Sequence, residues 1–262
     1  MSETNTAPVL LARDGGIATI SFNRPEAMNA LDVPTGHALL AICRELKVDT
    51  ALRVVVLRGN GRAFGVGGDL AALQHNAAET AGELITCAHE AVLILAALNA
   101  PVIASLHGAV AGGSLSLAMA CDLAIAADTT RFNLAYANVG ASCDVSGSWN
   151  LPRLVGLRNA MQIALLSDTF DAAEALRLGL VNRVVPAAEL EAATQTLAQR
   201  LAAGPTLAYG RMKRLLRQSF DHTLPEQLDA ERENFQASAR TADFKGAVNA
   251  FLAKQPATFT GH

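Results

Sequence analysis

The sequence predicts an α/β protein in which a mostly parallel sheet is followed by a helical C-terminal region. Short runs of β-branched residues alternate with segments of helical periodicity up to about Leu154. Two of these runs lead directly into glycine-rich turns, and from Leu154 onward the pattern indicates helices only. Because strand, helix and strand in alternation imply right-handed crossovers, we expect the sheet to be buried and mostly parallel.

The individual elements follow from local patterns. Residues 9–12 and 17–22 are expected to be paired strands, because Asp14, Gly15 and Gly16 between them are typical of a hairpin turn. Pro101 ends a long helix over residues 78–98, since the residue before a proline leaves the helical region. The other expected strands are residues 53–57, 102–106 and 122–126, and the other expected helices are residues 34–47, 112–120, 158–166, 172–178, 187–202, 205–218 and 225–252.

The composition limits the partners of the chain. Of its 262 residues, 51% are hydrophobic and 17% are charged, which is more apolar surface than one core usually needs. We therefore expect a homo-oligomer. A net charge of −3 offers no electrostatic basis for binding nucleic acid. The one basic cluster, Arg211, Lys213, Arg214 and Arg217, is expected to form a solvated helix face, with contact to a ligand phosphate as the alternative.

The sequence carries no pattern for secretion, a membrane span or a metal. The four cysteines follow no Cys-x-x-Cys spacing and are expected to be reduced thiols. The N-terminus lacks the apolar segment of a secretory signal. The most apolar stretch, residues 84–106, contains His89, Glu90, Asn99 and Pro101, which argues against a membrane span. We expect a cytoplasmic protein without a metal ion, because no group of His, Asp and Glu has metal-ligand spacing.

Two glycine-rich segments are the candidates for chemistry. Residues 61–70 follow the strand at 53–57, and residues 107–114 follow the strand at 102–106. Each lies where open α/β sheets bind ligands, and each leads into a helix whose first amides have no internal acceptor. Neither segment matches the dinucleotide fingerprint or the P-loop. The residues alone therefore indicate an anion or oxyanion site of unknown purpose, or simply two tight turns.

Five segments of the chain share one resemblance. They are residues 23–31 (NRPEAMNAL), 61–70 (GRAFGVGGDL), 108–122, 151–156 (LPRLVG) and 173–181 (AEALRLGLV). In this order they resemble signature segments of the crotonase (enoyl-CoA hydratase/isomerase) superfamily, over nearly the whole chain. The resemblance implies the crotonase (ClpP-like) spiral fold of ββα repeats with a helical C-terminal trimerisation region. Residues 1–200 are then expected to form the α/β core that binds acyl-CoA, and residues 201–262 to contact other subunits and CoA.

The resemblance also implies a site and partners. Gly68 and Gly113 match the two oxyanion-hole positions, and Asp144 matches the single catalytic aspartate of several family isomerases. CoA is part of the acyl-CoA substrate, so no separate cofactor is expected, and the family forms homotrimers or dimers of trimers. Phe251 and Lys254 match residues that reach the CoA of a neighbouring subunit. The other expected substrate contacts are Arg24, Met28, Ala30, Ala63, Gly67, Asp69, Leu70, Val110, Gly112, Ser116, Tyr136, Val139 and Gly140.

The chain departs from the hydratases of this family at two positions. Those enzymes use two glutamates to hold and activate water, and these positions fall on Ser116 and Tyr136, neither of which is a carboxylate base near pH 7. Asp144 lies among Val, Trp and Gly residues and is expected to be partly desolvated. Residues 151–153 and the tail at 251–261 look especially like the phenylacetate-pathway enoyl-CoA isomerase. The leading hypothesis is an enoyl-CoA isomerase in which Asp144 moves a proton from the α- to the γ-carbon.

Other interpretations are open at this point. Asp144 is also compatible with a helix N-cap or turn, and His89 with a satisfied structural histidine. In the family's 4-chlorobenzoyl-CoA dehalogenases, an aspartate nucleophile works with a histidine and a tryptophan. Asp144 and His89 match the first two, and Tyr136 stands at the third position, so hydration or hydrolytic dehalogenation is the alternative. A third interpretation is a catalytically inactive CoA-binding or scaffold protein, since both glutamates are absent.

Overall fold

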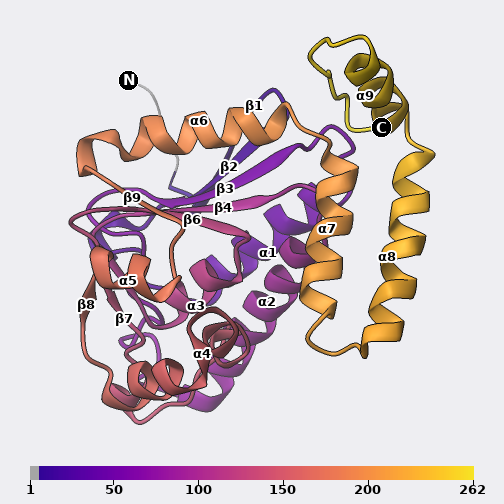
Figure 1. Ribbon diagram of the computed structural model, residues 1–262. Coiled ribbons are helices and arrows are strands. Elements are labelled where there is room, and N and C mark those ends of the chain that lie inside the picture. Colours follow the sequence, from indigo (N-terminus) through magenta and orange to yellow (C-terminus); the bar gives the residue numbers. More distant parts are fainter. Residues whose placement is uncertain (1–5) are drawn as a thin grey trace, which may run out of the picture.

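The computed structural model describes residues 6–262. The expectation of no signal segment rests partly on the first five residues, which lie outside the described part. Most of the described chain forms an α/β core, and three C-terminal helices lie beside it and extend away from it (Figure 1). In Figure 1 the main sheet runs across the core with α6 above it and α1, α2 and α3 below it. This arrangement confirms the predicted α/β class with a helical C-terminal region.

A six-stranded sheet forms the centre of the core, in the order β1-β2-β3-β4-β6-β9. The first two strands form the predicted antiparallel hairpin, and every other neighbouring pair is parallel, so these strands have their carboxyl ends at one edge. The strands of this sheet are β1 (Val9–Asp14), β2 (Ile17–Phe22), β3 (Val54–Gly59), β4 (Val102–Leu106), β6 (Leu123–Ala127) and β9 (Arg183–Val185). A smaller sheet contains β5 (Ala109–Ala111), β7 (Arg131–Asn133) and β8 (Phe170–Asp171).

Polar side chains mark where several helices begin. Asp32 accepts from the Thr35 amide at 2.9 Å before α1, and the Thr241 hydroxyl accepts from the Phe244 amide at 3.1 Å before α9. Such caps satisfy amides that have no acceptor within the helix. The helices are α1 (Val33–Lys47), α2 (Ala77–Ala97), α3 (Gly112–Ala120), α4 (Gly147–Leu166), α5 (Ala172–Leu178), α6 (Leu190–Ala202), α7 (Thr206–Gln218), α8 (Leu224–Ala239) and α9 (Ala242–Leu252).

Two expectations about the region after Leu154 are wrong. The region is not entirely helical, because β8 and β9 are strands and β9 pairs with β6 in the main sheet. A strand of three residues is too short to show its period in the sequence. The single helix expected over residues 225–252 is two helices, α8 and α9, because α8 ends before Arg240 and Thr241 caps a new helix. In addition, α4 begins well before residue 158 and is bent at the non-helical Gly156.

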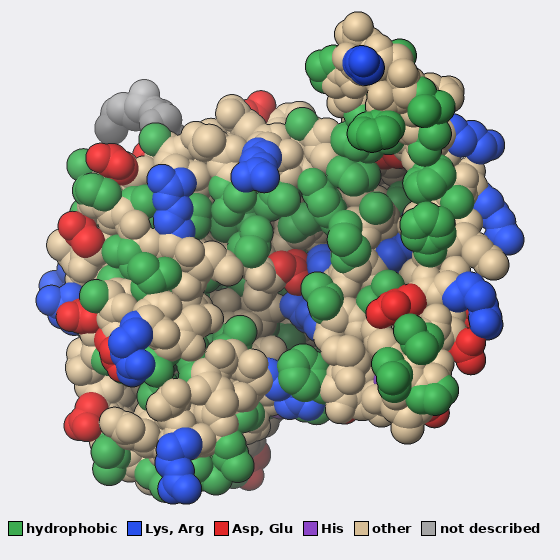
Figure 2. Space-filling view, in the orientation of Figure 1, with side chains coloured by type: hydrophobic (Ala, Val, Ile, Leu, Met, Phe, Trp, Pro, Cys, Tyr) green, Lys and Arg blue, Asp and Glu red, His purple; other side chains and the backbone are tan. Residues whose placement is uncertain are grey.

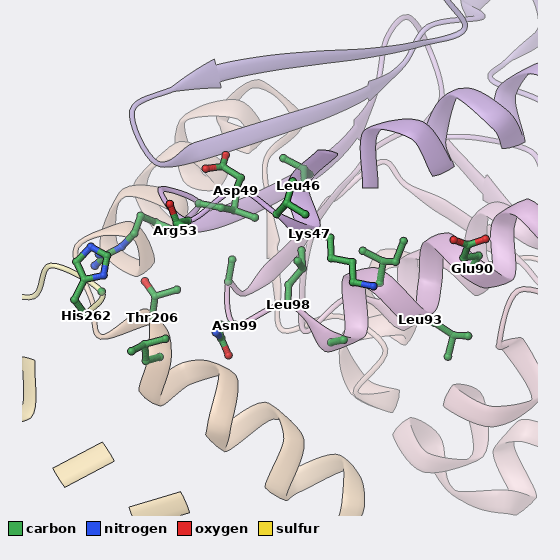
Figure 3. Close-up of a pocket in the computed structure, with 18 residues that line it drawn as sticks. Leu46, Lys47, Asp49, Arg53, Glu90, Leu93, Leu98, Asn99, Thr206 and His262 are labelled. Atoms are coloured by element: carbon green, nitrogen blue, oxygen red, sulfur yellow. The ribbon is translucent and has the colours of Figure 1, made fainter. Parts of the chain in front are cut away.

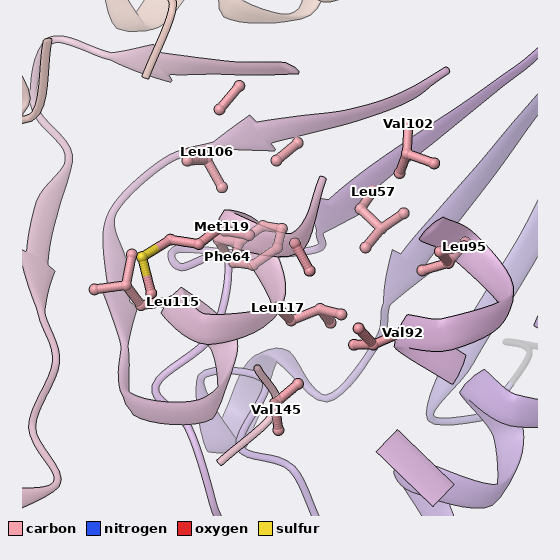
Figure 4. Packing of buried hydrophobic residues seen from close by; sticks show 14 of the residues in the cluster. Leu57, Phe64, Val92, Leu95, Val102, Leu106, Leu115, Leu117, Met119 and Val145 are labelled. Atoms are coloured by element: carbon pink, nitrogen blue, oxygen red, sulfur yellow. The ribbon is translucent and has the colours of Figure 1, made fainter. Parts of the chain in front are cut away.

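Packing on the lower face of the sheet immobilises α3. Leu57 and Leu106 from the sheet pack with Leu115, Leu117 and Met119 of α3 in one buried cluster (Figure 4). All residues of α3 are buried. Because each large apolar side chain contributes roughly 1.5–3 kcal/mol when buried, the first turn of this helix is held in place by the core.

Helix α2 is the one helix in residues 6–262 that is long and apolar enough, by length and composition alone, to cross a membrane. In the structure it packs against α1, and its buried residues include Cys87, Ala91 and Leu95. Its Glu90 accepts two hydrogen bonds from Arg44 of α1, at 2.9 and 2.8 Å. The helix is therefore part of the core of the domain. As expected, it ends before Pro101, and β4 begins after that residue.

Three residues of the basic cluster of α7 face the core, whereas Arg211 donates to the Ser238 hydroxyl of α8 at 3.3 Å. Lys213 Nζ lies 2.7 Å from Asp122 Oδ2, and Arg217 lies 2.9 Å from Asp122 Oδ1. Lys213 also donates to the Ala100 carbonyl at 2.9 Å, and Arg214 donates to Asn99 at 2.9 Å. Burial lowers the pKa of Lys213, and the Asp122 carboxylate opposes that change. The expected solvated helix face is therefore wrong for this cluster, because an acidic residue of the core attracts it and docks α7.

Apolar side chains gather over the C-terminal arm, which we define as α7, α8 and α9 (Figure 2). Leu224 and Phe251 are 71% and 82% exposed, values far above those of core residues. Contiguous apolar surface of this kind typically marks an interaction site. The other large apolar residues exposed on these helices and their connections are Met212, Leu216, Phe220, Leu228, Phe235, Val248 and Leu252.

We predict that Asp122→Asn destabilises the protein by about 3–5 kcal/mol, because the substitution leaves the nearly buried Lys213 ammonium without its counter-charge. Urea unfolding followed by circular dichroism measures the free energy. Glu191→Gln is the matched control, since it removes only an exposed ion pair with Arg58 at 3.3 Å and should change little. Equal stability of Asp122→Asn and the wild type would contradict the docking role of this pair.

Candidate active site

Two glycine-rich turns meet at the carboxyl edge of the main sheet. The first, residues 61–70, follows β3, and the second, residues 107–114, follows β4. The Phe64 amide donates to the His107 carbonyl at 2.9 Å, and the Ala111 amide donates to the Gly65 carbonyl at 2.9 Å. A third bond, from the Gly65 amide to the Ala109 carbonyl, measures 3.2 Å. The two segments are therefore joined as a short parallel strand pair.

Close approach explains two of the glycines at this contact. Gly108 has a φ of +58°, and a β-carbon there would collide with the Arg62 carbonyl oxygen. Gly67 has a φ of +90°, and a β-carbon there would lie 3.1 Å from the Gly113 nitrogen. Residues with side chains rarely adopt this left-handed region, and they would also push the turns apart. The glycines let the first turn lie directly against the start of α3.

The Gly68 amide points away from Leu31, whose backbone binds the residues on either side of Gly68. The Leu31 amide donates to the Gly67 carbonyl at 2.7 Å, and the Asp69 amide donates to the Leu31 carbonyl at 2.8 Å. The C=O of Gly67 and the N–H of Gly68 belong to one trans peptide group and point in opposite directions, so the Gly68 N–H points away from Leu31. Within residues 6–262, no group accepts a hydrogen bond from it. The Gly68 amide is therefore a free donor.

A second free donor lies at the start of α3. Gly113 is the second residue of this helix, where an amide has no intrahelical acceptor and carries the positive end of the helix dipole. The Ser114 hydroxyl strengthens the junction, because it accepts from the Gly67 amide at 3.1 Å. The predicted pair, Gly68 and Gly113, thus lies on two turns that touch through Gly67.

Asp144 lies beside this junction. A β-carbon on Gly113 would lie 3.4 Å from Asp144 Oδ1, and 3.7 Å from both Leu31 Cδ1 and Val145 Cγ2. The carboxylate and two apolar side chains therefore surround the α-carbon of Gly113. Asp144 itself is half-buried, which agrees with the partial desolvation expected from its neighbours in the sequence.

The segment that carries Asp144 has a constrained backbone. Val145 and Ser146 have φ values of 47° and 65°, in the left-handed region that non-glycine residues rarely occupy. The Val145 amide donates to His89 Nε2 at 3.2 Å, so this nitrogen carries no proton in the arrangement observed. The Gly147 amide donates to the Asp144 carbonyl at 2.8 Å. His89 therefore fastens the Asp144 segment to α2, as expected for a satisfied structural histidine.

Ser116 and Tyr136 form a hydrogen-bond chain that ends on Asp144. The Tyr136 hydroxyl donates to Asp144 Oδ1, and Ser116 Oγ lies 3.0 Å from the Tyr136 oxygen. Burial, followed by the nearby Asp144 carboxylate, raises the pKa of Tyr136, so the phenol keeps its proton. Because a carboxylate can only accept, the donors run from Ser116 to Tyr136 to Asp144.

Arg24 braces the turn that carries Gly68. Its guanidinium donates to the Ala30 carbonyl at 2.7 Å and to Asp69 at 3.0 Å, and it lies 3.0 Å from Asp32. Desolvation opposes the change, but hydrogen bonds from Arg24 and from the Ala72 amide hold the pKa of Asp69 below its ordinary value. Arg24 and Asp69, both expected at the substrate, thus bind each other across the turn.

The other residues expected at the site differ in their placement. Ala30, Ala63, Val110 and Gly112 are buried and belong to the glycine-rich turns or the segments beside them. Phe251 and Lys254 lie at the end of the C-terminal arm, and Figure 1 places α9 far from α3 and α4 of the same chain. A single chain therefore does not bring these two residues to Asp144. Of the remaining four, Met28 is half-buried and Leu70, Val139 and Gly140 are exposed.

The structure adds three residues to those predicted. Leu31 fixes the Gly68 peptide through its backbone, and Ser114 fixes the Gly67 amide through its hydroxyl. At Gly147 a β-carbon would collide with Ser116 Oγ, so α4 can begin against the Ser–Tyr–Asp chain only with glycine there. Each of these roles depends on contact between distant segments. The available signals were only a serine after two glycines and a leucine at the end of the first signature segment.

A cavity of about 720 Å³ lies at the opposite end of the sheet (Figure 3). Arg53, which precedes β3, and Asn99, which precedes β4, line it together with Thr206 at the start of α7. The glycine-rich turns follow the carboxyl ends of the same two strands, so this cavity is separate from the candidate site. No group of three or more His, Cys, Asp and Glu in residues 6–262 is arranged to hold a metal ion.

Comparison with known proteins identifies the family. The family model for enoyl-CoA hydratase/isomerase matches residues 12–262. A Rhodobacter capsulatus protein named as a probable enoyl-CoA hydratase is 37% identical over 94% of this chain and 95% of its own. The 1,2-epoxyphenylacetyl-CoA isomerase of Escherichia coli is 36% identical over 94% of this chain and 95% of its own. A solved enoyl-CoA hydratase of Mycobacterium smegmatis is 30% identical, with a TM-score of 0.90 over 95% of this chain and 98% of that one. This chain, with its fold and its paired glycine-rich turns, therefore belongs to the enoyl-CoA hydratase/isomerase family, the crotonase superfamily.

Proposed function

We propose that this member of the acyl-CoA family is an enoyl-CoA isomerase, which moves a carbon–carbon double bond. One observation carries the proposal: the half-buried Asp144 carboxylate lies against Gly113, whose amide and that of Gly68 are free donors. A carboxylate beside two such donors suits removal of a proton next to a thioester carbonyl. The Escherichia coli relative is named as the isomerase of an acyl-CoA, which supports isomerisation in this broader sense.

The proposed reaction needs one base and one oxyanion site. The Gly68 and Gly113 amides donate to the thioester oxygen of a 3-enoyl-CoA, and Asp144 takes a proton from the α-carbon. The electron pair of that C–H bond enters the conjugated system, so negative charge is shared between the thioester oxygen and the γ-carbon. Asp144 then returns the proton to the γ-carbon, which leaves the double bond between the α- and β-carbons. The atoms of substrate and product are the same, and neither water nor a cofactor takes part.

The surroundings of Asp144 support a reaction without water. Ser116 and Tyr136 stand where the resemblance places the hydratase glutamates, and the raised pKa of Tyr136 keeps it a donor at neutral pH. Leu31 and Val145 present apolar side chains next to Gly113. Such surroundings favour return of the same proton over addition of water.

We further propose that the CoA moiety lies along the first glycine-rich turn and that the protein acts in the cytoplasm as a homotrimer or a dimer of trimers. The hydrogen bond between Arg24 and Asp69 holds that turn in place. The apolar surface of the C-terminal arm supports assembly. Phe251 and Lys254 lie too far from Asp144 of their own chain to serve it, so in the proposed assembly they contact CoA held by a neighbouring subunit.

Hydrolytic dehalogenation of an aroyl-CoA is the second candidate, and the position of His89 favours it. His89 Nε2 lies 3.2 Å from the amide of Val145, the residue after Asp144. In this reaction Asp144 attacks a ring carbon, halide leaves, and water activated by His89 hydrolyses the resulting aryl ester. The Val145 amide, however, already occupies the lone pair that would accept the proton of that water. We therefore rank isomerisation first.

Asp144→Asn should lower kcat for the shift of a 3-enoyl-CoA double bond by about 10²- to 10⁴-fold, because the base is lost while its shape is kept. The rise in ultraviolet absorbance of the conjugated 2-enoyl thioester measures the rate. Asp14→Asn, at the exposed end of β1, is the matched control and should leave kcat unchanged. A wild-type rate for Asp144→Asn would show that Asp144 is not the base.

Gly113→Ala should fold normally yet lower kcat by about 10²-fold. The added methyl group would make ordinary contacts of 3.4 to 3.7 Å, but it would displace the thioester from between Asp144 and the amides. Thermal unfolding and the isomerase assay separate the two effects. Gly82→Ala, where a β-carbon meets nothing within 4 Å, is the control. An unchanged kcat in Gly113→Ala would contradict the placement of the thioester at Gly113.

Turnover in water enriched in oxygen-18 distinguishes the candidate functions. Isomerisation should leave the acyl product free of label, because no oxygen is exchanged. Label in the product, or transient label on Asp144 detected by peptide mass spectrometry, would instead support hydration or hydrolysis. Tight binding of acyl-CoA without turnover across a panel of thioesters would support the inactive CoA-binding protein.

A further inference from the structure

We propose that Tyr136, backed by Ser116, is a positioning residue that holds Asp144 Oδ1 and leaves Oδ2 as the oxygen that exchanges the proton with the substrate. The proposal rests on the function proposed above and adds residues that act through Asp144. It also gives a role in the site to Ser116 and Tyr136, which stand at the positions of the two hydratase glutamates.

The contacts of the two carboxylate oxygens differ. Asp144 Oδ1 accepts the hydroxyl of Tyr136, and in the described chain no donor reaches Oδ2. The same Oδ1 is the atom that faces the α-carbon of Gly113. With Oδ1 held, the carboxylate cannot rotate about its own axis, and Oδ2 keeps one orientation relative to the Gly113 amide. An unheld carboxylate would have to lose this rotational freedom each time substrate binds.

Ser116 holds Tyr136 in turn. Its oxygen lies 3.0 Å from the phenol oxygen, and the side chain is fully buried in the immobile helix α3. Ser116 cannot move toward α4, because Gly147 leaves no room beyond the Ser116 oxygen. Through the hydrogen bonds of Ser116 and Tyr136, the position of α3 therefore fixes the position of the Asp144 carboxylate.

Neither hydroxyl of Ser116 or Tyr136 is a base that activates water at neutral pH. Ser116 donates to Tyr136, and Tyr136 donates to Asp144, so the one proton of each hydroxyl is engaged. Burial and the Asp144 charge raise the pKa of Tyr136, so it does not become a phenolate base at neutral pH. A water molecule near Asp144 would find no second base to orient it.

The first test is the kinetic effect of Tyr136→Phe, which removes only the phenol oxygen. Hydrogen bonds to charged groups are strong, so we expect kcat to fall about 10- to 100-fold while KM changes less than about twofold. Ser116→Ala should have a smaller effect of the same kind. Tyr209→Phe is the matched control, because Tyr209 in α7 is the only other tyrosine of the chain and should leave kcat unchanged.

A double-mutant cycle shows whether Tyr136 acts through Asp144. In the Asp144→Asn background, Tyr136→Phe should lower the residual rate less than about twofold, because the group it positions is already gone. An effect of Tyr136→Phe as large as in the wild-type background would overturn the proposal, since it would show a role independent of Asp144. A merely structural role would lower thermal stability in both backgrounds alike, and that outcome would also overturn it.

An ultraviolet titration of Tyr136 reports on its hydrogen bond to Asp144 and does not require an activity measurement. In the Tyr209→Phe variant, Tyr136 is the only phenol, so alkaline ultraviolet difference spectra follow it alone. We expect no ionisation at about pH 10, where free tyrosine is half-ionised. Adding Asp144→Asn should move ionisation to lower pH, because the neighbouring charge is removed. Ionisation near pH 10 in Tyr209→Phe, or no change on adding Asp144→Asn, would overturn the proposed contact.

These outcomes distinguish an error in the proposed function from an error in the role of Tyr136. Full isomerase activity in Asp144→Asn would overturn the proposed function and the inference with it. Loss of activity in Asp144→Asn together with wild-type kcat in Tyr136→Phe would overturn the inference alone.

Discussion

The site depends on the contact between the two glycine-rich turns. Backbone hydrogen bonds join Phe64 and Gly65 to the segment after β4, and Gly67 lies against the nitrogen of Gly113. Neither turn can withdraw easily, because the second leads into a helix buried on all sides. The free amides of Gly68 and Gly113 are therefore set in place by the core before any ligand arrives. Donors that need no rearrangement are the most effective at stabilising developing negative charge.

Asp144 is held against this pair of turns by three separate elements. His89 of α2 binds the following amide, Tyr136 binds one carboxylate oxygen, and the Gly147 amide binds the carbonyl. The left-handed conformations of Val145 and Ser146 cost free energy of order 1–3 kcal/mol each, and contacts of this kind allow them to persist. Strain concentrated beside a carboxylate in this way is typical of a site whose geometry matters more than its stability.

The charged side chains of the core mostly join segments that are distant in the sequence. Arg24 connects the first loop to the first glycine-rich turn, and Asp122 connects the end of α3 to Lys213 and Arg217 of the C-terminal arm. Because these groups are largely shielded from water, breaking one partner costs more than it would at the surface. The arm is thus attached to the core by polar contacts while its apolar side chains stay exposed, a combination that suits a further apolar contact.

By itself the sequence determined the hairpin, the strands β3, β4 and β6, most of the helices and the location of the glycine-rich turns, because periodicity and turn chemistry are local properties. It also predicted Asp144 through a resemblance in one ungapped segment. Only the tertiary structure decided that β9 completes the sheet and that the basic face of α7 meets Asp122. A three-residue strand is too short to be distinguished from a loop in the sequence, and a charged helix face has the same sequence pattern whether it meets water or an acidic residue. The sequence likewise showed that Ser116 and Tyr136 are not carboxylates, but not what they bind. Their hydrogen bonds to one another and to Asp144 exist only because α3 packs against the segments on either side of them.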